Sequence, residues 1–124
     1  MKLIRLLFCV SVLAICPLLS SCKKPARPVD ATQSLTQSFQ AAQPDVKQTV
    51  GDVNNNLKTG NYLQAARAME PILESRTLTA QQKEAIGLTL QQIKQAIDAN
   101  PALESKELYE LRAKMFRAAT SSRF

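Results

Sequence analysis

The side chains that most often carry out chemistry in proteins are scarce in this sequence or poorly spaced for it. Histidine is absent from all 124 residues, which excludes Ser-His-Asp and Cys-His nucleophilic sites and histidine-ligated metals. The glycines at 51, 60 and 87 are too far apart to form a phosphate-binding loop. We therefore expect no catalytic residue, no metal site and no cofactor.

Carboxylates are the remaining candidates for acid–base chemistry. Glu70 and Glu74 are spaced to share one helix face, and so are Glu104, Glu107 and Glu110. A glycosidase-like pair needs one carboxyl group in a secluded pocket, where its pKa is raised. These five fall on the polar sides of the helices that the sequence predicts. We expect solvated surface carboxylates that support helices, and a protein that is not an enzyme.

The thiol of Cys22 directly follows a segment that resembles an export signal. Lys2 and Arg5 precede an apolar run over 6–19, which is shorter than the roughly 20 residues that a membrane-spanning helix needs. The small residues Ser20 and Ser21 follow, and then Cys22. This order predicts a cleaved export signal over 1–21. Cys9 and Cys16 would leave with the signal, so the mature chain would have no intrachain disulfide.

The segment Leu19-Ser20-Ser21-Cys22 is similar to the lipobox of bacterial lipoproteins, an aliphatic residue followed by two small residues and a cysteine. The resemblance implies cleavage between Ser21 and Cys22 and lipidation of the Cys22 thiol with acyl chains such as palmitate. Lys23 replaces the aspartate that commonly retains such proteins at the inner membrane, which implies sorting to the outer membrane, facing the periplasm. An ordinary signal peptide that is cut nearby is the alternative.

The charge balance is mildly basic, with 16 Lys and Arg against 10 Asp and Glu. Removal of Lys2 and Arg5 with the signal leaves a formal charge of +4. The chain has no dense basic run and no interleaved aromatic residues, so we expect no nucleic-acid partner. The surplus is compatible with anionic lipid headgroups or peptidoglycan carboxylates.

After a lipidated N-terminus and tether over 22–29, the apolar spacing is helical and predicts one domain over 30–120. Apolar residues recur every three or four positions from Leu35 to Leu57, straight through Pro44. This predicts either one long helix kinked at Pro44 or two helices with a break at Gln43, and the preserved phase favours the kink. Gly60 is well placed to end this helical region in a left-handed conformation.

Three further helices follow in the prediction. One begins at Asn61. Another begins at the capping box formed by Thr79 and Gln82, and this helix runs to Asn100. The last opens at Leu103 or Ser105. The sequence therefore predicts an all-α fold, a small bundle of about four helices. Because the connections at 58–61 and 75–79 are short, consecutive helices are expected to be antiparallel neighbours.

The segment around Gly60 resembles the middle of a tetratricopeptide repeat, with Tyr62 and Ala65 in the aromatic and small-residue places of the helical hairpin. The resemblance implies protein binding, for which Tyr62 and Arg67 are candidates. No second copy occurs at a 34-residue period, and a generic helical hairpin explains the same residues.

The last helix offers a second candidate surface, with Tyr109 and Phe116 one heptad apart and Arg112 between them. An amphipathic basic helix of this kind can bind a partner's groove or rest on a membrane. Its apolar stripe can equally serve to close the bundle.

Taken together, the sequence predicts a lipid-anchored envelope protein that acts as a non-enzymatic module for binding an envelope protein partner. The alternative is a structural spacer that contacts peptidoglycan or the anionic membrane surface.

Overall fold

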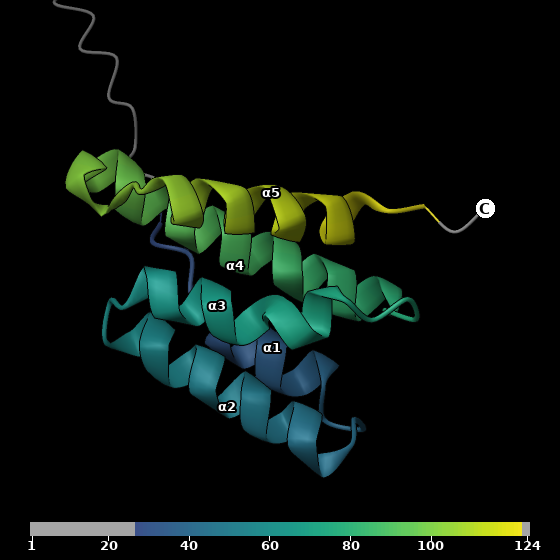
Figure 1. The fold of residues 1–124 in the computed structure, drawn as a ribbon. Helices are drawn as coiled ribbons and strands as arrows, with labels where there is room; N and C mark the ends of the chain where they lie inside the picture. The colour runs from purple at the N-terminus through teal and green to yellow at the C-terminus, as the bar shows by residue number, and fades with distance from the viewer. Residues whose placement is uncertain (1–26, 123–124) are drawn as a thin grey trace, which may run out of the picture.

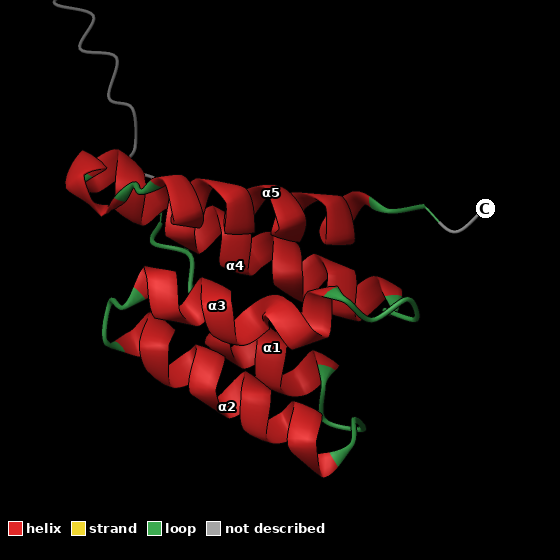
Figure 2. Ribbon diagram, in the orientation of Figure 1, coloured by secondary structure: helices red, strands yellow, loops and turns green. Residues whose placement is uncertain are grey.

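The computed structural model describes residues 27–122 and confirms the all-α prediction. Its elements are α1 (Thr32–Ser38), α2 (Pro44–Lys58), α3 (Tyr62–Leu73), α4 (Ala80–Ala99), the short 3₁₀ helix η1 (Pro101–Leu103) and α5 (Lys106–Thr120). No strand occurs within these residues (Figure 2). The predicted signal over 1–21, its cleavage position and Cys22 all lie outside the described residues.

The helices form a small bundle made of two hairpins and one short bridging helix (Figure 1). α2 packs antiparallel to α3, α4 packs antiparallel to α5, and α1 lies between α2 and α4. α3 completes the ring by packing against α5. The expectation of antiparallel neighbours therefore holds for the connection at 58–61. For 75–79 the pairing is looser, because α3 packs most closely against α2 and α5.

The preference for one kinked helix at Pro44 was wrong. α1 ends at Ser38, the backbone of Gln43 is extended, and Pro44 is the first residue of α2. Proline suits this position because its missing N–H would have no intrahelical acceptor there, whereas in a helix interior its ring would clash with the carbonyl of Gln40. Residues 27–122 thus contain five α-helices, which fits the predicted small bundle of about four.

Gly60 ends α2 as the sequence predicted. Its φ is +75°, in the left-handed region, and the turn is closed in the Schellman pattern. The N–H of Gly60 donates to the carbonyl of Leu57 at 3.2 Å, and the N–H of Asn61 donates to that of Asn56 at 2.8 Å. The chain can therefore reverse direction within three residues and lay α3 back along α2.

The predicted capping box fixes the start of α4. The N–H of Gln82 donates to Thr79 Oγ1 at 3.2 Å, and the N–H of Thr79 donates to Gln82 Oε1 at 2.9 Å. Ser105 caps α5 with its side chain alone, accepting from the N–H of Leu108 at 3.1 Å. Of the two sequence-based candidates for the start of the last helix, Ser105 is therefore the residue used.

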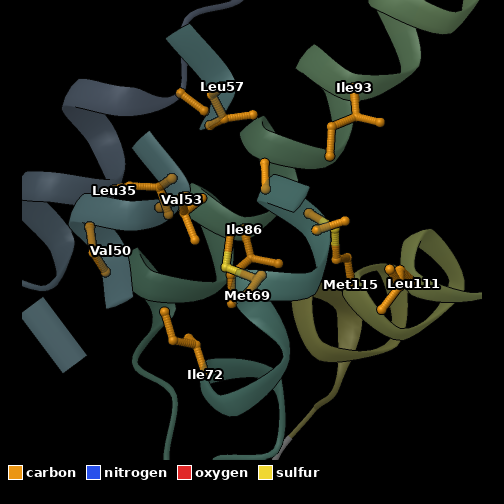
Figure 3. Packing of buried hydrophobic residues seen from close by; sticks show 14 of the residues in the cluster. Leu35, Val50, Val53, Leu57, Met69, Ile72, Ile86, Ile93, Leu111 and Met115 are labelled. Carbon is orange, nitrogen blue, oxygen red and sulfur yellow. The ribbon is translucent and has the colours of Figure 1, made fainter. Parts of the chain in front are cut away.

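All five α-helices contribute to one hydrophobic core (Figure 3). Its largest fully buried apolar side chains are Leu35, Val53, Met69, Ile86, Ile93, Leu108 and Met115. Asn54 is the notable polar residue beside them, and its Nδ2 donates to Thr36 Oγ1 at 2.9 Å. This bond ties α2 to α1, so the short helix is held by both packing and a side-chain hydrogen bond.

Candidate interaction site

A groove of about 550 Å³ runs between α4 and α5. Both helices line it. The lining residues of α4 are Gly87, Leu90, Gln91 and Lys94, and those of α5 are Tyr109, Arg112, Ala113, Phe116 and Arg117. We call this hollow the α4–α5 groove. It unites Tyr109, Arg112 and Phe116, the three candidates that the sequence placed on the last helix.

Tyr109 and Phe116 are exposed although the helix that carries them is firmly part of the bundle. They are 65% and 59% exposed, and no other large apolar side chain in residues 27–122 is comparably exposed. The neighbouring apolar stripe of α5 is buried and consists of Leu108, Leu111 and Met115. α5 can therefore both close the bundle and offer a binding surface, because its buried stripe packs into the core while the two rings lie beside that stripe.

The geometry of α5 explains this division. Tyr109 follows the buried Leu108 by one residue, and Phe116 follows the buried Met115 by one residue. One residue turns a side chain about 100° around a helix axis. Both rings are therefore rotated out of the core in the same direction, toward the groove.

The charged residues that line the groove are all cations. Lys94 pairs with Asp98 at 2.6 Å and Arg112 pairs with Glu104 at 2.7 Å, but neither carboxylate lines the groove. Arg117 forms no ion pair within residues 27–122. The Arg112 pair is less exposed than the Lys94 pair, so it is less screened by solvent. Arg117 is thus the lining cation most available to attract an anionic group.

Tyr62 and Arg67, the other two candidates, lie on α3 and away from the groove. Tyr62 is half-buried and packs against the core. Arg67 forms an ion pair with Glu107 of α5, with Nη2 at 2.6 Å from Oε2. This hydrogen-bonded pairing raises the pKa of Arg67 and lowers the pKa of Glu107. The structure gives Tyr62 a packing role and Arg67 a role in joining α3 to α5.

Three of the carboxylates considered for acid–base chemistry lie in ion pairs. Besides the pairs of Glu104 and Glu107, Glu70 accepts from Lys114 Nζ at 2.5 Å, which raises the pKa of Lys114. Glu70 and Glu74 line an open hollow of about 580 Å³ near the C-terminal end of α5. The cations Arg76, Lys83, Lys114 and Arg117 line it as well. No group of three potential metal ligands occurs in the described part of the chain.

The α4 wall of the groove was missed by sequence reasoning. Leu90 has the helical spacing of the buried residues Ile86 and Ile93, yet it is only partly buried and lines the groove. Gly87 was the available signal. A glycine in the middle of a well-capped helix weakens it relative to alanine, and an added Cβ would meet only Ala119 Cβ at 4.0 Å, an ordinary contact.

The N-terminal tether is fastened to the side of α4. The N–H groups of Val29 and Ala31 donate to the side-chain oxygens of Gln95 and Gln92, each at 2.9 Å. Asp30 Oδ1 accepts from the N–H of Thr32 at 3.0 Å and from its hydroxyl at 2.7 Å. These bonds to Asp30 lower the pKa of its carboxyl, the hydroxyl contributing most. The chain therefore enters the domain along the C-terminal half of α4 (Figure 1).

Comparisons with known proteins give no relative. None of the known family models matches this chain, and neither does any curated protein or solved structure. Between residues 27 and 122, no helix has both the length and the apolar character that crossing a bilayer requires.

Proposed function

We propose that this chain is an outer-membrane lipoprotein that faces the periplasm and binds a protein partner without catalysing a reaction. The observation that carries the docking proposal is the α4–α5 groove with Tyr109 and Phe116 exposed along it. Exposed aromatic residues beside an apolar hollow are typical of the anchoring points of protein interfaces. The lipobox-like segment ending at Cys22 supports the anchoring proposal.

The position of the tether supports a protein that combines membrane anchoring with partner docking. Val29 is bound to Gln95 of α4, and Cys22 lies seven residues before it. Seven extended residues span at most about 25 Å. A lipid on Cys22 would hold α4 within that distance of the membrane surface. A partner in the groove would therefore be recruited to the membrane.

Site-specific photo-crosslinking in isolated envelopes tests the docking proposal. A photoreactive amino acid replaces Phe116 in one variant and the exposed Gln48 of α2 in a matched control. We expect a discrete protein adduct at position 116 and none at position 48. Absence of an adduct at position 116, or equal adducts at both positions, would contradict docking through the groove.

The spacer role is the second candidate, and it is supported by the lack of carboxylates among the residues that line the groove. Such a surface suits anionic polymers or lipid headgroups. The measurement that separates the two roles is co-sedimentation with purified sacculi or anionic vesicles across a salt series. Salt-sensitive binding without a protein adduct at position 116 would favour the spacer over the docking module.

A further inference from the structure

We propose that the occupant of the α4–α5 groove is an amphipathic helix of a partner protein, with apolar residues on one face and carboxylates along its flanks. The inference rests on the proposed docking function and specifies the chemistry of the partner. Four features of the groove support it, namely the spacing of the aromatic residues, the small residues of the lining, the sign of the charge and the concave shape.

The spacing of the two aromatic residues matches a helical ligand. Tyr109 and Phe116 are seven residues apart on α5, which at a rise of 1.5 Å per residue is about 10.5 Å, or two turns. A helix laid along α5 presents side chains at i, i+3 or i+4, and i+7 with the same repeat. Each ring can thus contact one apolar position of the bound helix.

Small residues leave room for the apolar side chains of that helix. Gly87 on α4 and Ala113 on α5 both line the groove. The internal packing does not require glycine at 87, since a Cβ there would meet Ala119 Cβ at an ordinary 4.0 Å. A residue that disfavours its own helix, where packing does not demand it, is consistent with keeping the groove open for a ligand.

The charge of the groove selects an acidic occupant. Lys94, Arg112 and Arg117 line it and no carboxylate does. Asp98 and Glu104 already pair with the first two, so Arg117 is the lining cation without an ion-pair partner in residues 27–122. Carboxylates on the flanks of a bound helix would meet these cations. A second copy of this chain would bring another Arg117 and no lining carboxylate to the interface, so self-association through this groove is disfavoured.

The shape of the site favours a helix over a lipid surface. The hollow of about 550 Å³ lies between two packed helices. A bilayer surface can reach the rings of Tyr109 and Phe116, but it does not fill a recess between helices. An inserted row of side chains can contact the recessed Leu90 as well as both rings. A ligand with side chains that enter the groove therefore buries all three apolar groups better than a flat surface does.

Selection from a displayed library of random 16-residue peptides tests the proposal. The target is the protein purified from membranes and placed in nanodiscs of zwitterionic lipid. We expect enriched peptides to have apolar residues at helical spacing and Asp or Glu beside them. Enrichment of peptides without this pattern, or no enrichment at all, would overturn the inference.

Variants of the target establish where the peptides bind. Phe116→Ala and Arg117→Glu should each weaken binding of an enriched peptide by about tenfold or more, as expected for anchoring residues. Exchange of the single peptide carboxylate that faces position 117 for lysine should restore part of its affinity for Arg117→Glu. Lys58→Glu on α2 is the matched charge-reversal control and should change nothing. Unchanged binding to both groove variants would overturn the assignment to this groove.

Two further measurements keep the outcomes distinct. Gly87→Leu should block peptide binding while circular dichroism shows an intact helical fold, which separates loss of the groove from loss of folding. Binding of the protein to anionic vesicles through Phe116, with no peptide enriched, would overturn the inference in favour of a lipid surface. A protein adduct at position 116 together with non-acidic peptides would leave the docking function standing and refute only the acidic helix.

Discussion

Tyr109 and Phe116 occupy equivalent positions two turns apart on α5, each one residue after a fully buried core residue. This relationship lets one helix do two things. Its buried stripe closes the bundle, and its adjacent face supplies the exposed aromatic wall of the α4–α5 groove. Because the two faces are separate, changes on one should leave the other largely intact.

The separation of the two faces of α5 predicts different effects on stability. Phe116→Ala removes a ring that is 59% exposed and should change the free energy of unfolding by no more than about 0.5 kcal/mol. Leu108→Ala removes a fully buried side chain and should cost about 2–5 kcal/mol. Chemical denaturation of both variants measures this. If the two losses were equal, the Phe116 ring would belong to the core.

Replacement by alanine should raise the stability of the fold at Gly51 in α2 and lower it at Gly60 in the turn that follows. Gly60→Ala forces a Cβ into a left-handed conformation at φ +75° and should destabilise the fold by about 1 kcal/mol or more. Gly51→Ala adds a Cβ with no atom within 4 Å inside a helix, and should stabilise it by about 0.5–1 kcal/mol. Thermal unfolding of both variants checks the pair. Stabilisation by Gly60→Ala would show that the left-handed turn is not required.

The capping box should behave as a coupled unit. Thr79→Ala leaves the N–H of Gln82 without its acceptor and should cost about 1 kcal/mol. The double variant with Gln82→Ala should cost less than the sum of the two single changes, because both residues serve one motif. Gln81→Ala on the same exposed turn is the control. Strict additivity in denaturant unfolding would argue against a reciprocal box.

Asp30 should make stability depend on pH in the acid range. Hydrogen bonds from Thr32 lower the pKa of its carboxyl in the folded state, so the folded state favours the ionised form. This stabilisation is fully present above the unfolded-state pKa of about 4 and is lost as pH falls through the folded-state pKa.

Asp30→Asn keeps a side-chain oxygen as acceptor and removes the titration. The difference in unfolding free energy between wild type and Asp30→Asn should therefore shrink as pH falls from about 5 to about 3. Urea denaturation at several pH values gives this difference, and the other carboxylates cancel in it. A difference that is independent of pH would contradict the role given to the Thr32 bonds.

Local signals were sufficient to predict several features of the fold. The capping box at Thr79, the turn at Gly60 and the buried stripe of α5 each depend on residues within a few positions of one another. Such interactions are encoded in short stretches of sequence, so residue types and spacing predict them.

Features that depend on tertiary packing were not predictable in the same way. The apolar phase continues through Pro44 because Leu35 and Val53 both pack into one core from two separate helices. The sequence pattern cannot distinguish that arrangement from a kinked helix. The pairing of α3 with α5, and the contribution of Gly87 and Leu90 to the groove, likewise depend on which helices become neighbours. The residues that α4 contributes to the groove therefore could be identified only from the structure.

The proposed lipid anchor on Cys22 is tested most directly by an intact-mass measurement. The protein is purified from membranes beside a Cys22→Ser variant. We expect a wild-type chain that begins at Cys22 and carries added acyl mass, and a variant that lacks both the acyl mass and the cleavage. A wild-type protein without lipid, beginning at a different residue, would contradict the claim.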